Sequence, residues 1–239
     1  MDLSQRKKLL DHVICALDLP TMDEALALVD AVGDRLAYYK VGSRMFTRYG
    51  AELLDALDER GVKVFLDLKF HDIPNTVADA VESAAGYDAV FMMTVHASGG
   101  AEMVRRAARA AAEADHSPKI VAVTALTSLS AEELAGIGVD LALEQWAVRL
   151  GRLAIDAGAD GLVCSAHEAA AMRERFGDGP LLVTPGIRPE HKMAENDDQS
   201  RVMTPKDALA TGSSFLVIGR PIYQADDPVE AVEAIGGSL

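Results

Sequence analysis

Three charged residues, Asp67, Lys69 and Asp72, stand within six positions of one another in this chain of 239 residues. They follow residues 62–66, a β-branched and aromatic run that is typical of a buried strand. Because side chains alternate faces along a strand, Asp67 and Lys69 are expected to lie side by side at its end. A lysine flanked by carboxylates that maintain its charge and position can serve as a general acid. The alternative is an ion pair that only stabilises the strand end.

Eight short apolar segments that alternate with helical patterns form the frame around this stretch, and a long polar segment follows the seventh. The predicted strands are residues 12–17, 36–41, 62–66, 89–95, 119–125, 161–164, 181–184 and 215–218. The predicted helices are residues 21–32, 49–59, 76–85, 101–114, 131–134, 141–156, 167–176 and 229–234. Since no hairpin joins consecutive strands, this α/β pattern predicts a single (β/α)8 TIM barrel domain over residues 1–239. An open doubly wound sheet is the alternative, but its Gly-x-Gly-x-x-Gly turn is missing after the first strand.

The ends of the predicted strands carry a set of charged and polar residues. In a barrel these residues gather at the C-terminal rim, where barrel enzymes build their active sites. Any one of them alone is better explained as a solvated strand end, but their joint placement favours a site. The set is Asp18, Lys40, Asp67, Lys69, Thr127, Arg188 and Arg220. The polar segment at about 188–204 follows the seventh strand and is predicted to be an active-site lid.

Two short motifs after the last two strands suit a phosphate group. Residues 185–188 read Pro-Gly-Ile-Arg, and residues 219–222 read Gly-Arg-Pro-Ile. Barrels often hold phosphate at these loops with backbone N–H groups and an added cation. Gly219 lets the backbone approach a ligand closely, and Arg220 offers a bidentate guanidinium. The simpler interpretation of each motif is a glycine turn followed by a surface arginine.

Composition narrows the classes of partner. A formal net charge of −14 disfavours nucleic-acid backbones and anionic membranes, and no apolar run approaches the length of a membrane span. The two cysteines, Cys15 and Cys164, fall in separate predicted strands and are interpreted as reduced core thiols of a cytoplasmic protein. No His or Cys spacing suits a metal ion, so no metal or cofactor is predicted.

The motif Asp67-x-Lys69-x-x-Asp72, continued through Thr76, resembles the signature of the bacterial orotidine 5′-phosphate decarboxylase family. The resemblance extends from Asp18 to Arg220 and implies cofactor-free conversion of orotidine 5′-phosphate to uridine 5′-phosphate in pyrimidine biosynthesis. By this resemblance Lys69 protonates a C6 carbanion, and Asp67 lies beside the departing carboxylate. Asp18 and Lys40 resemble the family's ribose-binding and charge-network residues.

The same resemblance assigns the remaining site residues. Thr127 resembles the family's contact to the pyrimidine. The residues that resemble its phosphate and loop contacts are Arg188, Gln199, Gly219 and Arg220. It also implies a homodimer in which Asp72, Ile73 and Thr76 reach the neighbouring subunit's site. Thr94 stands where Asn is expected, and the role of His96 stays open. The alternatives are a related metal-dependent barrel, either a sugar-phosphate decarboxylase or an aldolase, and a non-catalytic barrel that binds a phosphorylated metabolite.

Overall fold

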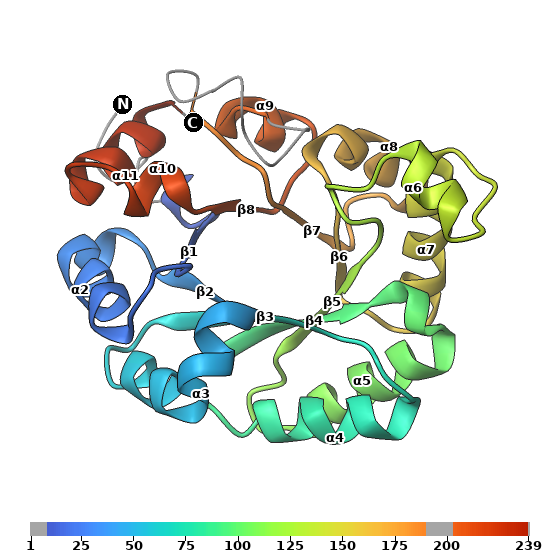
Figure 1. The fold of residues 1–239 in the computed structure, drawn as a ribbon, viewed down its shortest axis with the longest axis horizontal. Coiled ribbons are helices and arrows are strands. Elements are labelled where there is room, and N and C mark those ends of the chain that lie inside the picture. The colour runs from blue at the N-terminus through green and yellow to red at the C-terminus, as the bar shows by residue number, and fades with distance from the viewer. Residues whose placement is uncertain (1–8, 190–202, 239) are drawn as a thin grey trace.

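Eight parallel strands close into a barrel in the computed structural model, which describes residues 9–189 and 203–238. Each strand pairs with the next in sequence, and the last strand pairs with the first, as Figure 1 shows in a view along the barrel. The strands are β1 Val13–Ala16, β2 Tyr38–Gly42, β3 Lys63–Phe70, β4 Val90–His96, β5 Lys119–Val123, β6 Gly161–Val163, β7 Leu181–Thr184 and β8 Phe215–Ile218. The predicted barrel is therefore confirmed.

Helices surround the barrel as an outer ring (Figure 1). They are α2 Met22–Val32, α3 Ser43–Asp58, α4 Pro74–Ala84, α5 Ala101–Glu113, α6 Ala131–Gly136, α7 Leu143–Asp156, α8 Ala166–Phe176, α9 Pro205–Ala210, α10 Arg220–Tyr223 and α11 Pro228–Ser238, with short 3-10 turns at Gly33–Arg35 and Ala97–Gly99. Pro74 starts α4, where its missing N–H costs no hydrogen bond. The helices within residues 9–189 and 203–238 include no candidate for a membrane span.

Apolar side chains fill two layers, one between the strands and the helices and one inside the barrel. The inner layer includes Ile14, Phe65, Met92, Val121 and Val183, all buried. Three aromatic rings near the N-terminal ends of their strands pack together there, with Tyr38 4.8 Å from Phe91 and 5.4 Å from Phe215 between ring centroids. These rings pack at one end of the barrel, and the charged residues that follow the strands lie at the other end.

The helices depart from the prediction in three places. The helix expected at residues 49–59 begins earlier, at Ser43, and Gly50 interrupts it with a φ of 53°. Gly50 is a kink within a longer helix, whereas the sequence pattern predicted a helix that starts near this residue. The short helices α9 and α10 were not predicted, although Thr204 accepts a hydrogen bond from the Asp207 N–H as an N-cap of α9. Cys15 and Cys164 are both free and buried, and burial raises the pKa of the Cys15 thiol to about 12.

Candidate active site

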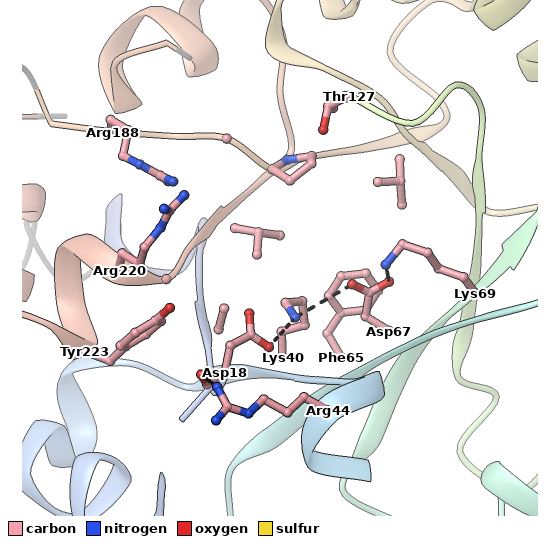
Figure 2. A pocket seen from close by; sticks show the side chains of 16 residues that line it. Asp18, Lys40, Arg44, Phe65, Asp67, Lys69, Thr127, Arg188, Arg220 and Tyr223 are labelled. Carbon is pink, nitrogen blue, oxygen red and sulfur yellow. Dashed lines mark hydrogen bonds and ion pairs between the residues drawn. The ribbon is translucent and has the colours of Figure 1, made fainter. Parts of the chain in front are cut away.

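Every second residue of a barrel strand points inward, and these inward positions are apolar in the barrel interior and polar at its C-terminal end. Along β3 the inward positions are Phe65, Asp67 and Lys69, spaced by two residues. Phe65 lies at the bottom of a cavity of about 470 Å³, and the two charged residues line its wall. Figure 2 shows these side chains pointing into the same space. The apolar layer below and the charged layer above therefore come from one alternating pattern.

Four of the charged residues form a chain of alternating sign. Lys40 Nζ lies 3.1 Å from Asp18 Oδ1 and 3.8 Å from Asp67 Oδ2, and Lys69 Nζ lies 2.8 Å from Asp67 Oδ1. The side chains of Lys40 and Asp67 are only 11% and 12% exposed, whereas that of Lys69 is 36% exposed. We call Asp18, Lys40, Asp67 and Lys69 the charge array. Its least enclosed ammonium group faces the cavity, where a ligand would meet it.

Gly42 leaves room for the array. A Cβ atom at this position would lie 2.8 Å from Lys40 Nζ and 3.2 Å from Asp18 Oδ1. The first distance is shorter than real Cβ contacts, so any side chain here would displace the lysine or its partner. Gly42 is the last residue of β2 and pairs with Asp67 of β3. A side chain at position 42 would therefore project into the charge array.

Arginines gather on the other side of the same cavity. Arg188, Gly219 and Arg220 follow β7 and β8 and line the wall with Tyr223. Arg188 is buried, and its Nη1 donates a hydrogen bond to the carbonyl of Ile187 at 3.0 Å. In Figure 2 the guanidinium groups of Arg188 and Arg220 point toward the same space. We call Arg188, Gly219 and Arg220 the cationic end, and its chemistry suits a phosphate or another small anion.

The structure brings together most of the predicted site residues and separates three of them. Thr127 lines the cavity with the charge array and the cationic end. Asp72, Ile73 and Thr76 are exposed and do not line it, and Asp72 accepts a hydrogen bond from the Ile73 N–H at 2.6 Å. They lie where β3 leads into α4. Gln199 and most of the predicted lid lie outside the described residues, although Arg188 N donates to Met203 O at 3.0 Å across that segment.

Three residues of this region were missed by the sequence analysis as contributors to the site. Arg44 lines the cavity and donates from Nη1 to the backbone oxygen of Asp18 at 3.4 Å. Tyr223 lies on α10, three residues after Arg220, and burial and the nearby Asp18 raise the pKa of its phenol. Thr94 is buried on β4 and hydrogen-bonds to both Asp67 and Lys69. The sequence feature that could have identified Thr94 is its position on β4, two residues before His96 and therefore on the same face of the strand.

His96 stands beside this site rather than in the wall of the cavity. Its ring lies 5.2 Å from that of His71 between centroids. Burial, followed by the neighbouring His71 and Lys69, lowers the pKa of His96 below 6.5, while Asp67 acts in the opposite direction. The neutral imidazole is therefore favoured at this position. Among the residues that the structure describes, no group of three or more His, Cys, Asp or Glu side chains is arranged to hold a metal ion.

Comparisons with known proteins agree with this geometry. The family described as orotidine 5′-phosphate decarboxylase / HUMPS matches residues 11–235. Proteins named orotidine 5′-phosphate decarboxylase are 49% identical in Dichelobacter nodosus and 50% identical in Pseudomonas paraeruginosa, over 95% of this chain and 98% and 97% of theirs. The crystal structure of orotidine 5′-phosphate decarboxylase from Lactobacillus acidophilus has a TM-score of 0.83 and 38% identity, covering 94% of this chain and 97% of that one.

Proposed function

Because the chain belongs to the orotidine 5′-phosphate decarboxylase / HUMPS family, we propose a mechanism by which its site converts orotidine 5′-phosphate to uridine 5′-phosphate in pyrimidine biosynthesis. The family description spans more than one activity, but the relatives at 46–50% identity are named for this decarboxylase. The reaction makes the protein a carboxy-lyase. The observation that carries the mechanism is the ion pair of 2.8 Å between Lys69 and Asp67 inside the cavity.

Lys69 is the proton donor in this proposal. The bond from C6 of the pyrimidine to its carboxylate breaks, carbon dioxide leaves, and the electron pair stays on C6. The Lys69 ammonium group stabilises this carbanion and then transfers a proton to it, so that a C6–H bond forms. The lysine recovers a proton from solvent. Asp67 holds the ammonium group in place and lies beside the departing carboxylate.

The other residues of the cavity bind and position the nucleotide. Asp18 and Lys40 contact the ribose, and Thr127 contacts the pyrimidine. Arg188, Gly219 and Arg220 hold the phosphate, with Gln199 of the preceding segment as a further contact. Binding energy from the phosphate can then be used to place C6 against Lys69. The separation of the charge array from the cationic end within one cavity supports this division of roles.

Asp72, Ile73 and Thr76 act in a neighbouring subunit's site in this proposal. In their own chain they are exposed and lie outside the cavity wall, although they directly follow the strand that carries Asp67 and Lys69. Ile73 is 65% exposed, which suits a residue that is covered by a partner. A two-fold homodimer would place Asp72 of the partner subunit next to Lys69.

A decarboxylation assay with and without a chelator tests the proposed function. The absorbance of orotidine 5′-phosphate should disappear at the same rate in excess chelator, because neither the charge array nor the cationic end requires a metal ion to act. A rate that collapses with chelator and returns with magnesium would favour the sugar-phosphate alternative. Tight binding of the nucleotide without turnover would favour the non-catalytic one.

A further inference from the structure

We propose that Thr94 is a positioning residue that fixes both the backbone of Lys69 and the carboxylate of Asp67 through its single hydroxyl group. The inference rests on the proposed role of Lys69 as the proton donor. Thr94 is fully buried on β4, the strand next to β3, and its side chain points toward the charge array. No contact between Thr94 and the ligand is required, because it acts through the two residues that it holds.

The backbone of Lys69 has a conformation that needs support. Its φ is 54°, in the left-handed region that residues with a Cβ atom rarely adopt. The pairing of β3 with β4 changes register between Leu66 and Phe70, so this stretch lacks the regular ladder on that side. The Lys69 N–H instead donates to Thr94 Oγ1 at 2.8 Å. The hydroxyl oxygen therefore replaces a ladder bond at the residue whose side chain must be aimed.

The hydroxyl proton has a separate partner. Thr94 Oγ1 donates to Asp67 Oδ1 at 3.1 Å, and the same carboxylate oxygen receives Lys69 Nζ at 2.8 Å. A hydroxyl has one proton and accepts through its lone pairs, so accepting from Lys69 N–H leaves that proton for Asp67. Thr94, Asp67 and Lys69 thus form a closed loop of three hydrogen bonds. The loop sets the distance between the ammonium group and the carboxylate.

Thr94→Val tests the role of the hydroxyl, since valine has a similar shape and lacks both the donor and the acceptor. We expect kcat to fall by about 10- to 100-fold, the scale of a small misplacement of a catalytic group. The KM for orotidine 5′-phosphate should change little, because the cationic end is untouched. Thr94→Ser keeps the hydroxyl and should keep most of the wild-type kcat.

Thr184→Val is the matched control. Thr184 is also fully buried, and its hydroxyl also has two partners, Ser213 Oγ at 3.0 Å and Phe215 O at 3.2 Å. It lies on β7, away from the charge array, so its loss should lower stability without lowering kcat as Thr94→Val does. If Thr94→Val does not fold, Thr94→Ala and Thr94→Ser form the comparison, because only the alanine variant lacks the hydroxyl.

Hydrogen exchange of the Lys69 amide gives a readout that does not depend on catalysis. Exchange at this amide should be faster in Thr94→Val than in wild type and unchanged in Thr94→Ser and Thr184→Val. Wild-type kcat in Thr94→Val, an equal loss in Thr184→Val, or an equal loss in Thr94→Ser would overturn the inference. A wild-type protein without decarboxylase activity would overturn the proposed function instead, and the exchange measurement would still decide whether Thr94 holds the Lys69 backbone.

Discussion

The charge array and the cationic end face one another across a single cavity, but they are built in different ways. The array consists of residues in β2 and β3 and just after β1, and they pair with each other from Asp18 through Lys40 and Asp67 to Lys69. The cationic end comes from the connections after β7 and β8 and brings two guanidinium groups toward the same space (Figure 2). Acidic and basic side chains alternate on one side, whereas both charged side chains that the other side brings to the cavity wall are guanidinium groups.

In the proposed mechanism this difference corresponds to two tasks. An internally paired array fixes the position of a reacting group before any ligand arrives, which is what preorganised electrostatic catalysis requires. In the same mechanism the two guanidinium groups bind the phosphate, so they supply affinity. Changes in the array should therefore alter turnover, and changes in the cationic end should alter binding. The following experiments test that division, from the largest expected effect to the smallest.

Lys69→Ala should have the largest effect. Turnover should fall by at least ~10²–10⁴, the scale of general acid–base catalysis, while the product uridine 5′-phosphate still binds. Steady-state kinetics and calorimetry measure the two quantities. Lys119→Ala is the control, because Lys119 also lies 2.9 Å from a carboxylate, that of Asp160, but at the start of β5. A Lys69→Ala enzyme with near-normal turnover would remove Lys69 from the role of proton donor.

Mixed dimers should show that the array side is completed by a second subunit. Lys69→Ala and Asp72→Ala should each be nearly inactive alone, and refolding an equal mixture should restore about a quarter of wild-type activity per subunit, assuming random two-fold pairing. In half of the dimers one pocket carries both lesions and the other carries none. A mixture of Lys69→Ala with Asp67→Ala is the control, since both act in their own chain and no pocket is restored. No recovery in the first mixture would place Asp72 in its own subunit's site.

Arg220→Ala should weaken binding of the nucleotide by about 1.5–3 kcal/mol, the scale of a hydrogen bond to a charged group. The unphosphorylated nucleoside should bind wild type and variant equally, because it lacks the group that Arg220 recognises. Titration of both ligands measures the difference. Arg105→Ala, which removes an exposed ion pair with Glu102 on α5, is the control. An equal loss for nucleoside and nucleotide would show that Arg220 does not bind the phosphate.

Gly42→Ala should disturb the array without affecting the cationic end. The added Cβ atom would press on Lys40 Nζ, the end of a flexible side chain, so the protein should fold and Lys40 should shift. We expect kcat to fall by about tenfold, or about 1.4 kcal/mol in activation free energy. Gly237→Ala on α11, where no atom lies within 4 Å of the added carbon, should match wild type. Unchanged kcat in Gly42→Ala would show that the array tolerates movement of Lys40.

Substitution of His96 should have the smallest effect, and this effect should appear in how the free energy of unfolding depends on pH. The unfolded chain takes up a proton at His96 near pH 6.5, whereas the folded protein does so only at lower pH, because the folded pKa is lowered. The unfolded state therefore binds more protons as the pH falls through this range, and the free energy of unfolding decreases. Denaturant titrations should show a weaker decrease in His96→Gln. The same decrease in both proteins would mean that His96 is protonated equally in the folded and unfolded states.

The sequence pattern was sufficient to predict those site residues whose positions follow from the alternation of side chains along a strand. The alternation of side chains along a strand predicted Asp67 and Lys69 side by side, and the structure has their charged groups 2.8 Å apart, although the positive φ of Lys69 departs from regular strand geometry. The gathering of Asp18, Lys40, Thr127 and Arg220 around one cavity required the additional inference of a closed barrel, which is also confirmed. The start of α3 and the short helices α9 and α10 were missed, because a kink at Gly50 and brief capped turns give weak periodic signals.

The sequence by itself determined the barrel, the residues at its rim and the family, because alternation and motif spacing are properties of the chain in order. Only the tertiary structure decided which rim residues share a cavity and which face outward, and it separated Asp72, Ile73 and Thr76 from the pocket of their own chain. It also revealed Thr94 as a partner of both Asp67 and Lys69. That contact depends on the register between β3 and β4, and the irregular pairing between Leu66 and Phe70 could not be read from the inward position of Thr94 alone.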